Sequence, residues 1–253
     1  MYYLYVIYGY LTSNDAMSLR VQTFCKILND LGEEVIVISI DKQTPYIFQK
    51  HNGISYISIR EKSDAIFSRL QNYFFFKRRL KKLIAKLETQ LEIKGIFFYD
   101  IPPNAVSFLK KKAQANKFKI FHDSVEWYSP EQFILGKLSP SYALKDFLNR
   151  FLIDKQVSVF AISKYLYSYF VSKGIVAMRI PIMVDINEVS SKKSSYREKL
   201  VLAYAGSPGR KDYLKEMIEG FSDLNINELQ RVNFHIIGRH MWSFFEDDRW
   251  LWD

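Results

Sequence analysis

Apolar positions along the chain alternate between short continuous runs and longer segments in which they recur at helical spacing. Strands are predicted over residues 2–8, 35–40, 54–59, 95–99, 118–122, 157–162 and 176–180. Helices are predicted over a segment carrying Leu19, Phe24, Ile27, Leu28 and Leu31, and over residues 62–91, 104–116, 141–154 and 164–173. Strands that alternate with helices favour an α/β class with a mostly parallel sheet.

The pattern is interrupted once, by a polar stretch rich in Ser and Lys at Ser190–Ser195. A new strand follows at 200–205, then a helix at 212–221 and a strand at 232–237. A composition change of this kind is typical of a domain boundary. We therefore predict a first domain over 1–185, a linker over 186–198 and a partial second domain over 199–253.

Composition narrows the class of protein. Of the 253 residues, 48% are hydrophobic, enough for a sizeable core, and the single cysteine, Cys25, excludes an intramolecular disulfide. We expect Cys25 to be a buried structural thiol. The apolar N-terminus lacks a basic leader and a cleavage site, and no apolar run reaches the ~18 residues needed to span a bilayer. A cytoplasmic location is the default.

The net charge of +9 fits nucleic acid, an anionic membrane surface or a phosphorylated ligand, and residues 61–87 hold eight Lys or Arg against two acids. On a helical wheel, Phe75, Arg78, Lys82 and Lys86 lie opposite the apolar face. That face comprises Tyr73, Phe76, Leu80, Leu83, Ile84, Leu87 and Leu91. Phe75, Arg78 and Lys82 are therefore candidates for contact with an anionic membrane, peripherally on its inner face. The alternative is a core helix with a solvated basic face. Nucleic acid is not an expected partner, because no recognised module accompanies the patch.

A strand, a small-residue loop and a helix follow one another in Leu200–Asp212. Backbone N–H groups of such a loop and the helix N-terminus can hold a phosphate. Gly206 and Ser207, with the basic pair Arg210 and Lys211, are the candidate residues. The spacing fits neither a Walker loop nor a dinucleotide fingerprint. The alternative is an ordinary turn with a solvated basic pair.

Ionisable and aromatic residues follow a strand in Lys119–Pro130, KIFHDSVEWYSP. His122, Asp123 and Glu126 converge at the carboxyl end of a parallel strand, where ligands bind in open α/β sheets. Trp127 and Tyr128 offer flat surfaces for a sugar. A structural His at the strand end is the alternative for His122. Too few histidines are present for a recognisable metal site, so no metal is expected.

Three ordered stretches of the sequence resemble family 4 glycosyltransferases of the GT-B type. They are Lys119–Pro130, Phe160–Asp185 and Leu200–Asp212. The resemblance implies a Rossmann-like acceptor-side domain followed by an incomplete second Rossmann-like domain. It implies transfer of a hexose from a UDP- or GDP-sugar to a polysaccharide or lipid-linked acceptor. It also implies retention of configuration without a metal or cofactor. Under this resemblance Lys211 matches the basic residue that binds the donor diphosphate. Asp100 becomes a candidate catalytic group together with His122 and Asp123. The alternative role of Asp100 is that of a loop cap.

One part of the family pattern is missing. Those enzymes carry two Glu residues, separated by seven, that orient the donor, and Glu246 lacks a partner at that spacing. We therefore expect a truncated chain whose transfer activity is impaired. The rival hypothesis is a catalytically inactive, membrane-associated or protein-interaction module.

Overall fold

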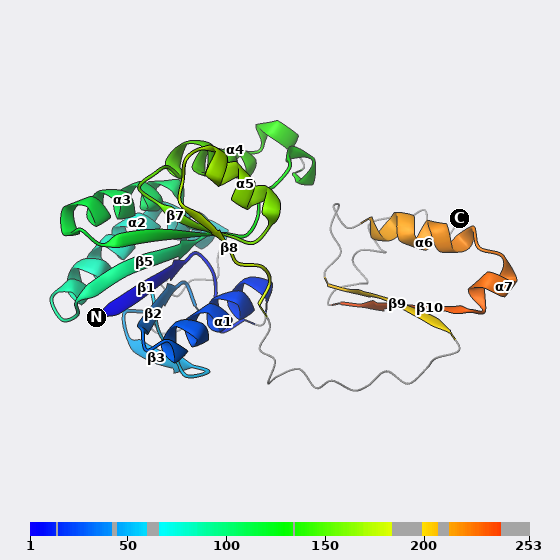
Figure 1. Ribbon diagram of the computed structural model, residues 1–253, viewed down its shortest axis with the longest axis horizontal. Helices are drawn as coiled ribbons and strands as arrows, with labels where there is room; N and C mark the ends of the chain where they lie inside the picture. The colour runs from blue at the N-terminus through cyan, green and yellow to red at the C-terminus, as the bar shows by residue number, and fades with distance from the viewer. Residues whose placement is uncertain are drawn as a thin grey trace. The chain divides into compact units, whose positions relative to one another are not determined.

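Eight strands form one sheet in the order β3-β4-β2-β1-β5-β6-β7-β8, parallel except for β3 against β4 (Figure 1). Their bounds are Tyr2–Ile7 (β1), Glu34–Ser39 (β2), Phe48–His51 (β3), Ile54–Ser58 (β4), Ile93–Tyr99 (β5), Lys119–Ser124 (β6), Ser158–Ala161 (β7) and Ala177–Arg179 (β8). In register, Leu4 pairs with Ile36 on one side and Ile96 on the other. From β1 the chain passes through α1 to β2, whereas β5 lies on the other side of β1, so the order of strands reverses there.

The computed structural model describes residues 1–13, 15–41, 45–59, 66–133, 135–183, 199–206 and 213–238, without the side chains of 66–72. The chain divides into two compact units, Met1–Val189 and Ser190–Asp253. The linker predicted over 186–198 lies outside the described residues. Along the described helices, none combines the length and the apolar character needed to cross a membrane.

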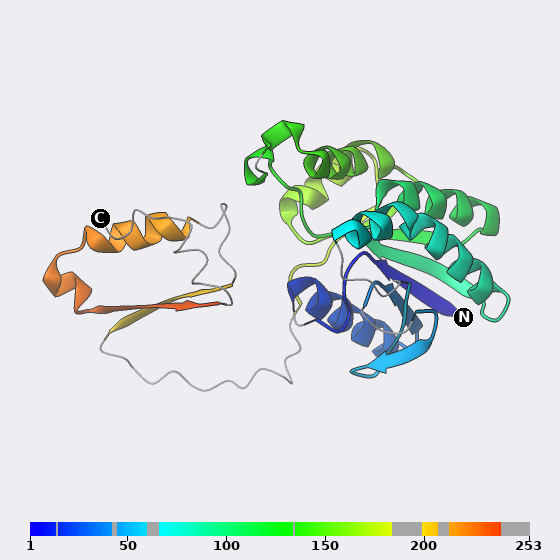
Figure 2. The same cartoon turned by 180° about the vertical axis from the view of Figure 1, so that it is seen from behind.

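Helices cover both faces of the sheet in the first unit, as Figures 1 and 2 show from opposite sides. One face is covered by α1 (Ala16–Asp30), and the other by α2 (Ile66–Glu88), α3 (Pro103–Asn116) and α5 (Lys164–Ser172). The link from β6 to β7 contains η1 (Pro130–Gln132), η2 (Gly136–Leu138), α4 (Pro140–Phe147) and the π-helical turn η3 (Leu148–Leu152). Ser163 caps α5 through its hydroxyl, and Gly174 at φ 69° follows the helix end, both as predicted.

Strand pleating sorts the residues of β1 between two cores. Leu4 and Val6 join the cluster beneath α2, α3 and α5, whereas Tyr5 and Ile7 join the cluster beneath α1. The α1 cluster contains Cys25, fully buried as predicted, and burial raises the pKa of its thiol. A row of stacked rings continues this core across the strands through Phe97, Phe121 and Phe160.

The α/β prediction is confirmed, and so are most predicted elements. In α2 the buried residues are Phe76, Leu80, Leu83, Ile84 and Leu87, as the helical wheel predicts. In α1 the predicted face is partly wrong, since Leu19, Ile27 and Leu31 are exposed while Ser18, Arg20 and Gln22 are buried. The short antiparallel β3 was not predicted. Strand β6 is longer than predicted and includes Asp123.

The second unit contains β9 (Leu200–Ala205) and β10 (Val232–Ile237), which pair in parallel. Between them lie α6 (Leu214–Ser222) and α7 (Ile226–Leu229). The ring of Phe221 stacks on that of Phe234 at 4.9 Å, which fixes α6 against β10. This strand–helix–strand arrangement has the parallel pairing expected of a Rossmann-like unit.

Candidate functional site

The carboxyl ends of β1, β5 and β6 meet at the point where the strand order reverses. In open α/β sheets this edge is where ligands bind, because neighbouring loops diverge there and leave a crevice. Asp100 follows β5, and His122 and Asp123 stand near the end of β6. A cavity of about 40 Å³ lies between them, with Glu126, Tyr128 and Asn149 also in its wall. It has room for a few waters or one or two sugar hydroxyls.

Asp100 is half-exposed at the rim of this cavity. Its backbone lies in the left-handed region at φ 46°, a conformation that Asp adopts more readily than most residues. Its Oδ1 accepts a hydrogen bond from Lys145 Nζ at 2.6 Å, so that α4 is tied to the end of β5. The ammonium of Lys145 also lies 4.4 Å from the ring centre of Tyr128. The carboxylate is therefore oriented and yet open to solvent.

His122 is a buried wall of the same cavity. Its ring stacks on Phe98 at 4.8 Å, and a side-chain hydrogen bond joins it to Asn149. Burial lowers its pKa to about 4, although the negative charge of Asp123 works in the opposite direction. Its Nδ1 is buried without a hydrogen-bond partner in the described part of the chain. At neutral pH the ring is therefore uncharged, and the hydrogen-bonding capacity of Nδ1 is unused within the described part of the chain.

Asp123 is 1% exposed and fully engaged by other side chains. Arg20 donates to it from Nε at 2.9 Å and from Nη2 at 2.7 Å, and the Tyr5 hydroxyl donates at 2.7 Å. Arg20 also donates to the carbonyl oxygens of Ile180 and Pro181. This ion pair joins α1, β1 and β6 to the segment after β8. Asp123 thus differs from the open Asp100: its oxygens hold the scaffold in place.

The three residues after β6 that were predicted to contact the acceptor lie in two places. Glu126 and Tyr128 line the small cavity. The pKa of Tyr128 is raised, mainly by burial and also by the hydrogen bond that its hydroxyl donates to Glu126. Trp127 packs instead against Tyr169 at 4.5 Å, and its Nε1 donates to Asp146. Arg150 lies over the Trp127 ring at 5.1 Å. The indole therefore contributes to the support of the site rather than to its wall.

The loop between β1 and α1 is held by a buried carboxylate that the sequence did not single out. Asp41 accepts hydrogen bonds from the backbone N–H groups of Leu11 and Thr12 at 2.9 and 3.0 Å, and from the hydroxyl of Ser39. A second cavity, of about 360 Å³, lies at the N-terminal turns of α1. Its lining includes Met17, Arg20, Tyr99, Glu126, Ile182 and Met183.

Of the four predicted donor-site residues, only Gly206 is described. It follows β9, and its N–H donates to the carbonyl oxygen of Ile237. Its φ of 154° is a conformation that favours glycine. Ser207, Arg210 and Lys211 lie outside the described residues.

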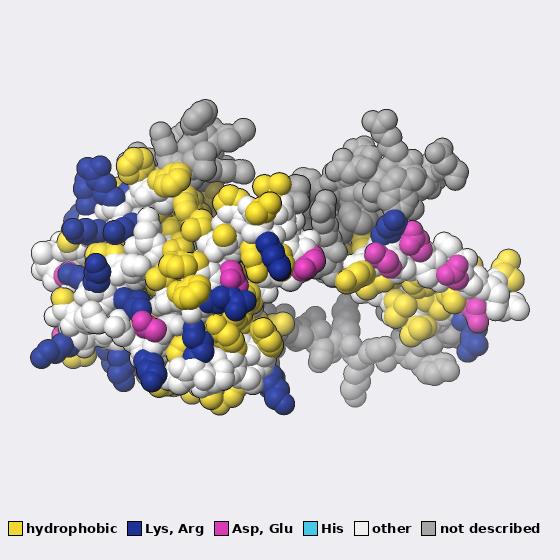
Figure 3. All heavy atoms as spheres, turned by 90° about the horizontal axis from the view of Figure 1, so that it is seen from above, with side chains coloured by type: hydrophobic (Ala, Val, Ile, Leu, Met, Phe, Trp, Pro, Cys, Tyr) yellow, Lys and Arg dark blue, Asp and Glu magenta, His cyan; other side chains and the backbone are white. Residues whose placement is uncertain are grey.

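The predicted membrane residues lie on the solvent side of α2. Phe75 is 45% exposed, and Arg78 and Lys82 are exposed beside it. The neighbouring Phe74, which the sequence did not single out, is 68% exposed. Figure 3 shows yellow hydrophobic side chains and dark blue basic ones gathered on one face of the first unit.

Comparison with known proteins finds resemblance in structure but not in sequence. No model of a known protein family matches the chain, and no curated protein matches it in sequence. WaaG, a glycosyltransferase involved in lipopolysaccharide biosynthesis, superimposes with a TM-score of 0.61 at 10% identity, over 97% of this chain and 65% of that one. Sucrose-phosphate synthase from Thermosynechococcus elongatus superimposes with a TM-score of 0.60 at 12% identity, over 92% of this chain and 70% of that one.

The catalytic domain of starch synthase IV from Arabidopsis thaliana, bound to ADP and acarbose, gives a TM-score of 0.58 at 11% identity, over 99% of this chain and 72% of that one. Identities this low show the fold alone. The fold is that of GT-B-type glycosyltransferases, as the sequence predicts. A Rossmann-like, mostly parallel first unit is followed by a partial second Rossmann-like unit, described over β9 and β10 with the helices between them.

Proposed function

We propose that the protein transfers a hexose from a UDP- or GDP-sugar to a polysaccharide or lipid-linked acceptor. The observation that carries the proposal is the small cavity at the strand-order reversal, whose lining brings Asp100, His122 and Glu126 to one space. GT-B-type enzymes of known structure share the fold around it. The ionisable side chains in its lining can bond sugar hydroxyls, which need hydrogen-bond partners when they leave water.

Three side chains have the positions to orient the reacting sugars. The open carboxylate of Asp100 can accept a hydrogen bond from an acceptor hydroxyl and raise its nucleophilicity. The free nitrogen of His122 can bond a hydroxyl of the donor or the acceptor, and exposed Glu126 can do so at the mouth of the cavity. Asp123 does not contact the sugars in this proposal. It is a positioning residue that fixes β6 through its ion pair with Arg20. In this proposal Tyr128 borders the acceptor, and Trp127 supports the acceptor side of the site from behind the cavity wall.

The donor diphosphate belongs to the second unit in this proposal. The loop after β9, with Gly206, Ser207, Arg210 and Lys211, would supply backbone N–H groups and two cations. Cations placed there stabilise the leaving diphosphate as its charge develops. The proposal includes retention of configuration and needs no metal. Product stereochemistry by NMR and rates measured with and without EDTA test these two parts.

Calorimetric titration with UDP-glucose and GDP-mannose tests the donor site. Lys211→Ala should weaken binding of whichever sugar nucleotide binds by about tenfold or more, since charge-assisted hydrogen bonds are worth about 1.5–3 kcal/mol. Lys215→Ala is the matched control, because Lys215 follows four positions later in the sequence, on α6, where it pairs with Glu219 at 3.6 Å. Binding that is equal in the two variants, or binding of neither nucleotide by the parent chain, contradicts the proposal.

An anionic membrane on the cytoplasmic side is the second proposed partner, supported by the exposed Phe74 and Phe75 among basic residues. Each Lys or Arg near such a surface contributes about 1 kcal/mol. Flotation with anionic vesicles should fall at least tenfold for Phe75→Asp, and stay unchanged for Phe48→Asp, an exposed aromatic on β3. A chain that floats but neither binds nucleotide sugars nor transfers a hexose supports the inactive membrane-associated module instead.

A further inference from the structure

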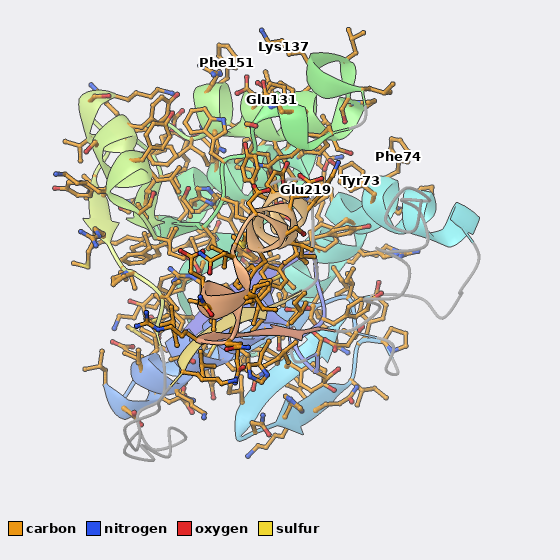
Figure 4. All side chains as sticks on the ribbon, turned by 90° about the vertical axis from the view of Figure 1, so that its right-hand side faces the viewer. Tyr73, Phe74, Glu131, Lys137, Phe151 and Glu219 are labelled. Carbon is orange, nitrogen blue, oxygen red and sulfur yellow. The ribbon has the colours of Figure 1, made fainter. Side chains whose placement is uncertain are left out.

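Between α2 and α4 runs a groove of about 470 Å³ that the proposed transfer reaction does not yet use. Tyr73 and Phe74 form one wall, and Leu144 and Leu148 form the other. Figure 4 shows the side chains of Tyr73 and Phe74 projecting from the same side of α2. The groove is about twelve times larger than the small cavity beside it, which has about 40 Å³.

The chemistry of the lining restricts what the groove can hold. Its lining is mostly aromatic or aliphatic and includes Ile101 and Pro103, with Ser141, Asp100 and Lys145 as its polar members. A sugar chain or an extended peptide would bring hydroxyl or amide groups that lose water without gaining partners, at a cost of roughly 1–3 kcal/mol each. A hydrocarbon chain carries no such groups. The lining therefore selects a lipid chain over a glycan or a peptide.

One end of the groove is polar and reaches the candidate active site. Asp100 and Lys145 line both the groove and the small cavity that contains His122. A chain lying in the groove would thus end beside the proposed acceptor-activating carboxylate. The ammonium of Lys145, about one-third exposed, can bind an anionic head group there.

The surroundings of the groove match a membrane-borne ligand. Phe74 lines it and is also largely exposed, and the adjoining solvent side of α2 is basic, with Lys77, Arg78, Lys81 and Lys82 exposed. An anionic bilayer attracts such a surface, and the exposed aromatic ring can enter the interface. A lipid could then pass from the bilayer into the groove.

We infer that the α2–α4 groove binds the hydrocarbon chain of a lipid-linked phosphate and delivers its head to Asp100. This inference rests on the proposed transferase function and selects, of the two acceptor classes, the lipid-linked one. Lys145 then exchanges its contact with Asp100 for one with the phosphate. The freed carboxylate accepts the proton of the attacking sugar hydroxyl of the lipid-linked acceptor, whose oxygen takes the hexose as the nucleoside diphosphate leaves.

Farnesyl phosphate, used below its micelle concentration, is the probe, and calorimetry gives its Kd. Binding should be at least tenfold tighter than that of geranyl phosphate, because each buried methylene adds to affinity. Farnesyl phosphate should also bind more tightly than farnesol, which lacks the charge, and than inorganic phosphate.

Variants of the groove test the same inference. Leu144→Asn should weaken the binding of farnesyl phosphate tenfold or more. Val171→Asn, at 45% exposure on α5 against 40% for Leu144, is the matched control. Ser141→Trp, which fills the groove from an exposed position, should also abolish binding.

Equal affinity for farnesyl and geranyl phosphate, or an equal loss in the Leu144 and Val171 variants, overturns the inference. Equal affinity for farnesol and farnesyl phosphate overturns the role of Lys145. UDP- and GDP-sugar binding is measured on the same samples. Nucleotide binding without lipid binding refutes the groove alone. Lipid binding without nucleotide binding refutes the transferase and leaves the groove as a lipid site.

Discussion

The buried ion pair between Arg20 and Asp123 should make Asp123→Asn a strongly destabilising change of almost constant volume. The native carboxylate accepts from Arg20 Nε, Arg20 Nη2 and the Tyr5 hydroxyl, all within 2.9 Å. The amide keeps one acceptor oxygen, but its NH₂ group faces a donor, and the guanidinium loses its counter-charge. Removing one partner of a buried pair costs about 3–5 kcal/mol.

Such a loss is a large fraction of the stability of a domain, which is typically about 5–15 kcal/mol. For a unit of this size each kcal/mol shifts Tm by roughly 2–4 °C, so Asp123→Asn should melt about 6 °C or more below the parent protein. Circular dichroism during heating, together with urea titration, measures both quantities. Loss of the proposed sugar transfer should follow the loss of folded protein.

Two further variants show whether the reasoning is right. Tyr5→Phe removes only one of the donors to Asp123 and should cost about 1–2 kcal/mol. Glu92→Gln changes an exposed carboxylate just before β5 and should alter stability by less than about 0.5 kcal/mol. If Asp123→Asn melts with the parent protein and yet abolishes transfer, Asp123 is a catalytic group and the positioning role is wrong.

The remaining predictions concern pH, a helix cap and the thiol. Because the pKa of His122 is lowered from 6.5 to about 4, the unfolded chain binds the proton more tightly, and stability is lost as pH falls from about 6.5 to 4. This contribution is about 3 kcal/mol, and urea titrations should show that His122→Gln removes it. Ser163→Ala should cost about 1 kcal/mol in the same assay, through loss of the cap on Leu166 N–H, whereas Ser172→Ala should not. Cys25 should react with a thiol reagent only as fast as the protein unfolds, and rapid labelling of the native protein would contradict its buried position.

Local periodicity predicted those elements whose packing follows from their own residues. In α2 the buried positions recur at helical spacing, so the sequence alone predicted its inner face and the exposed Phe75, Arg78 and Lys82. The same reasoning failed for α1, because Arg20 is buried by a partner 103 positions away in the sequence. The strand FQKH at 48–51 has no alternation to predict it and depends on its antiparallel pairing with β4.

The candidate site was predictable only in part. His122 and Asp100 stand at the ends of apolar strands, and the edge of a parallel sheet brings such positions together. Lys145 and Asn149 reach the same cavity from a link of irregular turns and short helices, whose path depends on tertiary packing. Trp127 was predicted to contact a sugar, but the aromatic ring and the carboxylate that engage it come from α5 and α4.

The strands at the two edges of the large sheet have a consequence for how the protein behaves at high concentration. On one edge β3 is four residues long and carries Lys50, and on the other β8 is three residues long and ends at Arg179. Short, charged edges offer few free backbone groups for another chain to pair with. Among the described residues of the second unit, β9 and β10 each have six residues and pair only with each other. Self-association by strand addition should therefore begin at the second unit.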